Sequence, residues 1–216
     1  MMMKIKGVIF DLDGVIVSTD EFHFKAWKVL ADREGIHFDR HINNRLRGVS
    51  RRESLEIILE KANRSYSENE ILEMLDFKNN IYRNSLSELT KYDILINFNE
   101  LYAKLRQNKI KMAIGSSSKN TKTILTQIGL IDAFDAIADG NDITRSKPDP
   151  EVFLLAAERL GLDPKECVVV EDAVAGIEAA KAGGMIAIAI NDATKCHIAD
   201  YKIDNLLEIA NIVLGE

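Results

Sequence analysis

Short apolar runs recur along the chain, and segments with a helical pattern separate them. The runs have the length of strands, and they lie at Ile5–Phe10, Met112–Gly115, Cys167–Val170 and Ile186–Ile190. Strands that are buried on both faces of a parallel sheet have this nearly continuous apolar pattern. Between them, apolar residues recur three and four apart, as helices require, for example at Val152, Leu155, Ala156 and Leu160. The alternation predicts an α/β fold with a doubly wound parallel sheet.

Residues 18–90 differ, because they contain no segment with a convincing strand pattern. Helical stripes recur there, and one of them consists of Phe22, Ala26, Val29 and Leu30 and stops at Gly35. Ser67-Glu68-Asn69-Glu70 has the pattern of a capping box that opens another helix. We therefore expect a small all-helical cap domain at 18–90, inserted after the first strand, and a core domain at 1–17 and 91–216. An insertion at that point lies above the ligand-binding edge of an α/β sheet and is suited to be a lid. A helical decoration with no moving part is the alternative.

Composition and charge narrow the class of protein. The chain has 216 residues, of which 46% are apolar and 29% charged, as in globular proteins with a sizeable core. The net charge of −6 disfavours a general nucleic-acid partner. Two isolated cysteines do not form a disulfide framework. No apolar run approaches the length of a membrane span. Because Met1-Met2-Met3-Lys4 leads directly into a strand-like segment, we expect no signal peptide and a cytoplasmic enzyme. We also expect a monomer.

The most informative segment is the first strand together with the turn after it. The run Val8–Phe10 ends in Asp11-Leu12-Asp13-Gly14, which places two carboxylates two residues apart. Residues with that spacing on a strand point to the same side. Two such carboxylates are tolerated when a cation lies between them or when one keeps a proton. The pattern indicates a metal site with a spare carboxyl group for proton transfer, whereas a solvated turn is the alternative.

Three later segments each follow a strand or lead into a helix. Gly115–Asn120 is rich in hydroxyl groups and can form an anion cradle, or only a serine-rich loop. Lys147 lies between a turn and a proline-started helix, where it is a positioned charge or a plain surface lysine. Glu171-Asp172 ends another buried strand and can supply carboxylates to Mg²⁺, although helix capping alone explains Asp172.

Together these segments resemble the motifs of the haloacid dehalogenase (HAD) superfamily of phosphotransferases. Asp11-Leu12-Asp13-Gly14 is similar to its first motif, Ser116 to its second, Lys147 to its third and Glu171-Asp172 to its fourth. The resemblance covers essentially the whole chain. It implies a HAD-like three-layer Rossmannoid core with a helical cap, a Mg²⁺ cofactor and an aspartyl-phosphate intermediate.

The resemblance also implies a role for each motif residue. Asp11 is expected to attack phosphorus, and Ser116 and Lys147 to bind the phosphoryl oxygens. Asp13 is expected to transfer the proton of the leaving or attacking oxygen. The implied ligands of Mg²⁺ are Asp11, the backbone carbonyl of Asp13, Glu171 and Asp172.

Gly48-Val49-Ser50-Arg51, Lys78-Asn79 and Ser118-Lys119-Asn120 resemble segments of the sugar-phosphate mutases of this superfamily. That resemblance implies an isomerase that interconverts β-D-glucose 1-phosphate and glucose 6-phosphate through glucose 1,6-bisphosphate. Such an enzyme needs a second, distal phosphate site, and Arg51 is its expected main ligand. The full set of expected substrate-binding residues is Thr19, His23, Trp27, Arg47, Gly48, Val49, Arg51, Lys78, Ser117, Lys119 and Asn120.

The chain departs from the mutase pattern at several positions. Arg47 stands where lysine is common, and Leu95-Ile96-Asn97-Phe98 lacks the usual Pro-Gly, so that we expect Asn97 to cap the next helix.

The main alternative function is a sugar-phosphate phosphatase with the same core chemistry. A catalytically idle phosphosugar-binding module is a second alternative, and the intact acidic residues argue against it.

Overall fold

The predicted parallel sheet is present, and its first strand lies near its centre. The computed structural model describes residues 4–215, so Met1–Met3 and Glu216 lie outside the described residues. All neighbouring strands are parallel, in the order β3-β2-β1-β4-β5-β6. The strands are β1 (Gly7–Phe10), β2 (Lys111–Gly115), β3 (Ala136–Ala138), β4 (Cys167–Glu171), β5 (Ile186–Ala189) and β6 (Tyr201–Lys202).

The apolar runs correspond to four of these strands, with ends that differ by one or two residues. The sequence pattern does not predict β3 or β6. β3 has three residues and β6 has two, which is too short for a periodic pattern to develop. Both lie at the edges of the sheet, where fewer apolar residues are needed.

Side chains along each strand alternate between two apolar layers, as the pleat of a strand requires. In β1, Val8 and Phe10 pack in the layer that contains α5, α6 and α9, whereas Ile9 packs against α7 and α8. Helices therefore cover both faces of the sheet, and the three-layer core is confirmed. These helices are α5 (Phe98–Gln107), α6 (Thr121–Gln127), α7 (Glu151–Leu160), α8 (Val174–Ala182) and α9 (Glu208–Leu214).

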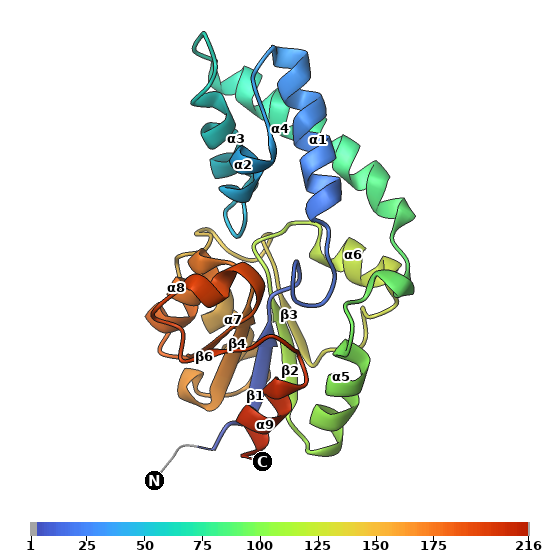
Figure 1. Ribbon diagram of the computed structural model, residues 1–216, viewed down its shortest axis with the longest axis vertical. Helices are drawn as coiled ribbons and strands as arrows, with labels where there is room; N and C mark the ends of the chain where they lie inside the picture. The colour runs from blue at the N-terminus through green and yellow to red at the C-terminus, as the bar shows by residue number, and fades with distance from the viewer. Residues whose placement is uncertain (1–3, 216) are drawn as a thin grey trace.

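Four helices lie above the carboxyl edge of the sheet, between β1 and α5 in the chain (Figure 1). They have an apolar cluster of their own, which includes Trp27, Leu55 and Met74. The capping box at Ser67 and the stop at Gly35 are both present. Val29, expected on the buried stripe, is instead 46% exposed. The helices are α1 (Asp20–Glu34), α2 (Arg40–Asn44), α3 (Arg51–Leu59) and α4 (Glu68–Ser85).

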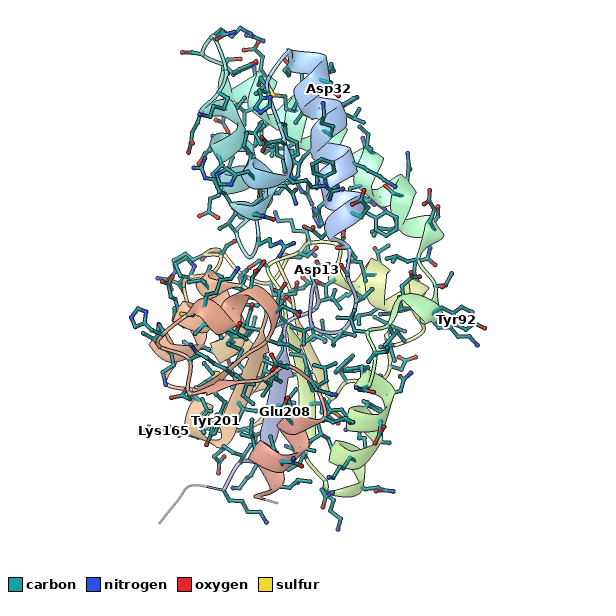
Figure 2. All side chains as sticks on the ribbon, viewed as in Figure 1. Asp13, Asp32, Tyr92, Lys165, Tyr201 and Glu208 are labelled. Carbon is teal, nitrogen blue, oxygen red and sulfur yellow. The ribbon has the colours of Figure 1, made fainter. Side chains whose placement is uncertain are left out.

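The connection back to the core corrects one expectation. Asn97 precedes α5 with φ of 69°, but its side chain makes no capping hydrogen bond. Its Nδ2 donates instead to Oδ1 of Asn205, at 3.0 Å, so a left-handed backbone turn begins the helix. Nearby Tyr92 extends outward from the return segment (Figure 2) and is 86% exposed. Within residues 4–215, no helix combines the length and apolar character needed to cross a membrane.

Candidate active site

Three carboxylates meet at the carboxyl ends of the two central strands. β1 and β4 are neighbours with Phe10 beside Val170, so Asp11 and the pair Glu171 and Asp172 follow at the same edge. Carboxylate oxygens of these three acids all lie within 4.8 Å of one another. The spacing and the all-oxygen donors fit a hard divalent cation. We call Asp11, Glu171 and Asp172 the acidic cluster.

Electrostatics support the same interpretation of the acidic cluster. Burial raises the pKa of Glu171 despite the nearby Lys147. Burial, together with the charges of Glu171 and Asp11, also raises the pKa of Asp172. Carboxyl groups that are crowded and buried in this way gain stability from a proton or from a cation between them. The cluster could therefore hold a divalent metal ion, whose binding would displace protons.

Lys147 is the fixed positive charge within this site. Its Nζ donates to Asp11 Oδ1 at 2.6 Å and to Glu171 Oε1 at 2.5 Å, and the side chain is 1% exposed. Burial opposes the charge, but the two carboxylates outweigh it and raise the pKa of Lys147 above its ordinary value. A lysine held in this way stays protonated and orients Asp11 and Glu171.

Asp13 lies beside the acidic cluster but points elsewhere. β1 ends at Phe10, so Asp13 belongs to the following turn and not to the strand itself, which corrects the expectation that both acids share one strand face. Its Oδ1 accepts hydrogen bonds from the amide and the hydroxyl of Thr19, and that hydroxyl accepts from Tyr82 Oη at 3.1 Å. Burial raises the pKa of Asp13 to about 6, which suits proton transfer near neutral pH.

Two glycines allow close approach of the backbone around this edge. Gly14 has φ of 75°, and a Cβ there would lie 1.9 Å from Oδ2 of Asp172. Gly48, in the loop between α2 and α3, has φ of 76°, and a Cβ there would lie 3.0 Å from the Cβ of Ala173. The first glycine keeps the acidic residues together, and the second brings the loop against the core.

The serine-rich segment after β2 faces the same opening. Ser116 Oγ accepts from the amide of Ser118 at 3.2 Å. Ser117 Oγ is buried without a hydrogen-bond partner in the described chain, so it is a donor available to a ligand. Ser118 also lines the opening, although it is absent from the residues that the sequence predicts to bind substrate. The polar groups expected for an anion cradle are thus present.

A buried polar group lies on the opposite wall, between α1 and α4. Lys78 Nζ is 2.8 Å from His23 Nδ1 and 4.6 Å from the ring centroids of both Trp27 and Tyr82. Burial lowers the pKa of Lys78 and of His23 well below their ordinary values. An anionic or hydroxylated ligand at this wall would favour protonation of the Lys78 and His23 pair.

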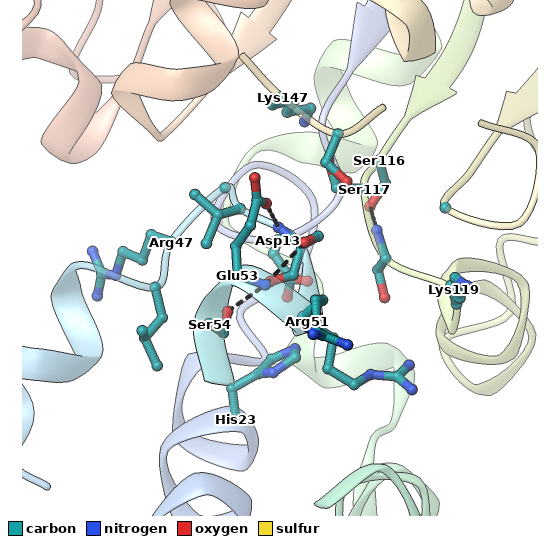
Figure 3. A pocket seen from close by; sticks show the side chains of 18 of the residues that line it. Asp13, His23, Arg47, Arg51, Glu53, Ser54, Ser116, Ser117, Lys119 and Lys147 are labelled. Carbon is teal, nitrogen blue, oxygen red and sulfur yellow. Dashed lines mark hydrogen bonds between the residues drawn. The ribbon is translucent and has the colours of Figure 1, made fainter. Parts of the chain in front are cut away.

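The arginines of the loop and of α3 are in contrasting situations. In the described part of the chain, Arg51 has no hydrogen bond or ion pair, although burial disfavours its charge and lowers its pKa. Arg47 is fully engaged: Nη1 donates to Asp192 at 2.7 Å and Nη2 to Asp20 at 3.1 Å. Figure 3 shows Arg47 directed away from Asp13. The charge of Asp76 acts on Arg51 and opposes the effect of burial, but the two do not form an ion pair. A partly buried arginine without an ion-pair partner is a site for an anion.

These groups surround one cleft of about 1400 Å³ between the four helices and the sheet. Figure 2 shows Asp13 at this boundary. The cleft brings together most of the residues that the sequence singled out: Asp11, Asp13, His23, Trp27, Arg47, Gly48, Val49, Arg51, Lys78, Ser116, Ser117, Lys119, Lys147 and Asp172. Contributions from segments so far apart in the sequence indicate a site for a ligand that contacts both units.

Three expected residues do not line the cleft. Thr19 is fully buried beside Asp13. Glu171 is buried next to Lys147. The Nδ2 of Asn120 donates to Oδ1 of Asn79 on α4, at 3.0 Å, so this amide joins the core to the four helices above the sheet.

Sequence reasoning also missed residues that support the site. Tyr82 continues the inward stripe of Met74 and Lys78 at a spacing of four residues, and that period was a usable signal. Asp192 gave no such signal, because its partner Arg47 is 145 residues away in the chain. Only the folded sheet brings the two together.

Comparisons with known proteins agree with this geometry. The model of the haloacid dehalogenase-like hydrolase family matches residues 5–184. The chain is 41% identical to β-phosphoglucomutase of Bacillus subtilis strain 168 over 98% of this chain and 95% of that protein. It is 32% identical to a phosphorylated carbohydrates phosphatase of Thermotoga maritima, over 84% of this chain and 82% of that protein.

A solved structure gives the same result. The crystal structure of β-phosphoglucomutase from Clostridium difficile superposes with a TM-score of 0.90 and 36% identity, covering 98% of this chain and 100% of that chain. The chain is therefore a homologue of β-phosphoglucomutase, a protein of the isomerase class, and it is more distant from the phosphatase. On this evidence, the chain belongs to the haloacid dehalogenase-like hydrolase family.

Proposed function

We propose that this protein is a β-phosphoglucomutase, which interconverts β-D-glucose 1-phosphate and glucose 6-phosphate through glucose 1,6-bisphosphate. The observation that carries the proposal is that two cations line the cleft from different units: Arg51 lies at the start of α3 and Lys119 in the core loop after β2. Among the described residues neither side chain forms an ion pair. A mutase must bind a second phosphate while the first is transferred. Arg51 and Lys119 are suited to that task, with Ser117 and Ser118 as neutral donors.

In the proposed reaction, Asp11 is the nucleophile and Asp13 the proton carrier. Asp11 Oδ1 accepts from Lys147, which leaves the other carboxylate oxygen, Oδ2, available to bond to phosphorus. Lys147 and Ser116 would balance the charge that spreads over the phosphoryl oxygens in the transition state. The raised pKa of Asp13, about 6, allows this carboxyl group both to give and to take a proton near neutral pH.

The proposed reaction consists of two phosphoryl transfers, and Asp13 carries the proton in both. A hydroxyl of glucose 1-phosphate loses its proton to Asp13, and its oxygen attacks the phosphorus of aspartyl-phosphate, so that the P–O bond to Asp11 breaks and glucose 1,6-bisphosphate forms. The bisphosphate turns around, and Asp11 attacks the phosphorus of the 1-phosphate. The sugar oxygen then leaves with the bonding electron pair and takes the proton from Asp13, which yields glucose 6-phosphate.

We propose Mg²⁺ as the divalent ion of the acidic cluster, with the carbonyl of Asp13 as an added ligand. Three carboxylates within 4.8 Å offer the few oxygen ligands that Mg²⁺ takes while it retains room for phosphate oxygens. When bound, the ion would neutralise charge on the transferring phosphoryl group.

We also propose that residues 18–90 are a cap domain that excludes water from the cleft, with Thr19 at its hinge. Its separate apolar cluster supports this role, as do the His23 and Lys78 groups on its cleft wall. Water exclusion matters because aspartyl-phosphate is otherwise hydrolysed. We also propose that the protein acts as a monomer in the cytoplasm and that its substrates are small sugar phosphates.

The product of β-glucose 1-phosphate turnover tests this proposal. With Mg²⁺ and a trace of glucose 1,6-bisphosphate, we expect phosphorus NMR to show conversion to glucose 6-phosphate, and a faster rate as the bisphosphate is increased. Inorganic phosphate as the main product would instead support a sugar-phosphate phosphatase. The absence of both products would support a binding module.

A further inference from the structure

A single ion pair joins the helical unit to the core within residues 4–215. It links Arg47, in the loop between α2 and α3, to Asp192 on the short 3₁₀ segment η4 (Asn191–Lys195), with Nη1 and Oδ2 2.7 Å apart. The other ion pairs of the described residues lie within one unit. Figure 1 shows this loop reaching down from α2 and α3 toward α8.

The η4 segment is bonded to the loops that carry the acidic residues. Asn191 Nδ2 donates to the carbonyl of Gly14 at 2.9 Å. The amide of Ala193 donates to the carbonyl of Asp172 at 2.9 Å. Asp192 therefore lies between two residues that are bonded to the loops of Asp13 and Asp172. Its Oδ1 also accepts from Lys195 Nζ at 2.6 Å, which leaves Oδ2 for Arg47.

The other partner is anchored just as firmly on the cap side. Arg47 Nη2 donates to Asp20 at the start of α1, and the second oxygen of Asp20 accepts from Asn43 Nδ2 at 3.0 Å. The next residue, Gly48, lies against Ala173, since a Cβ there would be 3.0 Å from the Cβ of Ala173. The guanidinium thus bridges the hinge side of the cap and the core.

We propose that Asp192 is a positioning residue: through Arg47 it holds the loop 46–50, and with it Arg51 at the start of α3, over the acidic cluster. Arg47 then acts as a strut between the two units, and Arg51 meets the distal phosphate. The inference rests on the proposed function only where it concerns phosphate binding. The placement of the loop stands independently of the reaction.

Hydrogen exchange of the substrate-free protein tests the placement of the loop. Asp192→Asn removes the charge but keeps the shape of the side chain. The matched control is Glu60→Gln, which breaks the Arg45–Glu60 pair. That pair is 2.8 Å long and also partly exposed, but it lies inside the cap. We expect amides 46–50 to exchange about two- to five-fold faster in Asp192→Asn, as fits one partly exposed ion pair, and to be unchanged in Glu60→Gln. Equal exchange in both variants would overturn the proposal.

Kinetics with β-glucose 1-phosphate test the consequence for Arg51. Asp192→Asn should raise KM about two- to five-fold with little change in kcat, and the difference should shrink in about 1 M salt, where the Debye length is about 3 Å. Asp192→Glu should restore most of the loss. In the Arg47→Gln background, Asp192→Asn should have no added effect. Additive effects, or faster exchange without a change in KM, would contradict the positioning role.

If the protein yields no glucose 6-phosphate, the proposed function fails, while the exchange result still decides whether Asp192 holds the loop. If glucose 6-phosphate forms and the loop exchanges alike in all variants, the positioning role fails alone.

Discussion

Most cap helices differ from the core helices at the cleft in how the first backbone amides are hydrogen-bonded. The N-cap side chains of α2, α3 and α4 (Asp39, Ser50 and Ser67) each accept a hydrogen bond from a backbone amide of their own helix. The N-cap residues of α6, α7 and α8, which follow the loops at the cleft, make no such bond. Three of the four cap helices are therefore capped by their own N-cap side chains, and α1 is the exception. At the cleft, the N-cap residues of three core helices provide no such cap, although Asp149 accepts from the first amide of α7.

For charged side chains the contrast is reversed, because the buried cation of the core is paired and the cation of the cap is not. In the core, the buried Lys147 is matched by two carboxylates. In the cap, Arg51 faces the cleft unmatched among the described residues. The core site is thus ready for a metal ion and covalent chemistry, and the cap site is ready for a free anion. Substitutions in each unit test this division of roles.

The largest effect is expected at the proposed nucleophile. Asp11→Asn removes the attacking charge and should lower kcat by about 10⁴-fold or more, as loss of a nucleophile does in other enzymes. Rapid-quench assays should also find no phosphoenzyme. Circular dichroism serves as the control for folding. Full turnover in this variant would exclude covalent transfer through Asp11.

A smaller and different effect is expected at the cap arginine. Arg51→Ala should lower kcat/KM for β-glucose 1-phosphate by about 10²-fold, since a charged, partly desolvated phosphate contact is lost, and should increase the share of inorganic phosphate among the products. The control is Arg64→Ala, which removes a surface arginine that pairs with Glu70 and should leave turnover unchanged. Similar losses in both variants would show that the cap arginine has no specific role.

The acidic cluster should make metal binding dependent on pH. The pKa values of Glu171 and Asp172 are raised without a metal ion, so protons compete with the cation at low pH and leave as pH rises. Saturation of Mg²⁺ at about 100-fold above Kd adds about 2.7 kcal/mol of stability. Differential scanning fluorimetry should therefore show a larger increase in Tm at pH 8 than at pH 6, and none in Asp172→Asn. An increase that falls with pH would contradict the metal assignment.

The smallest effect concerns a cap helix. Ser67→Ala removes the hydroxyl that accepts from the Glu70 amide and should lower the free energy of unfolding by about 1 kcal/mol. Turnover should be unchanged, because this helix start lies outside the cleft lining. Denaturant titration measures the first quantity. A loss of activity at unchanged stability would mean that the caps of the helical unit belong to the site.

Much of the core could be predicted from the sequence, because buried parallel strands leave a continuous apolar run and their polar ends follow directly. Asp11 and Asp172 were found in this way, whereas Lys147 was found by its place between a turn and a proline-started helix. The short β3 and β6 carry too few residues for a pattern. Contacts between segments that are far apart in the sequence could not be predicted at all. Asp192, for example, finds its partner Arg47 only in the folded protein, where η4 lies beside the loop of Arg47.

Residue type alone also could not distinguish the two arginines of the loop region. Arg47 and Arg51 are four residues apart and both were expected to bind substrate. The fold pairs Arg47 with two carboxylates and leaves Arg51 without one among the described residues. Such differences arise from tertiary contacts, which no local pattern records.

The central claim is that the cleft binds two phosphate groups at once, one at Asp11 and one at Arg51. A crystal structure with Mg²⁺, trifluoroberyllate and glucose 6-phosphate tests it most directly. We predict a trifluoroberyllate group bonded to Asp11 and, in the same cleft, a sugar phosphate contacted by Arg51. A sugar phosphate that is bound without Arg51, or anion density at the acidic edge alone, would contradict the account.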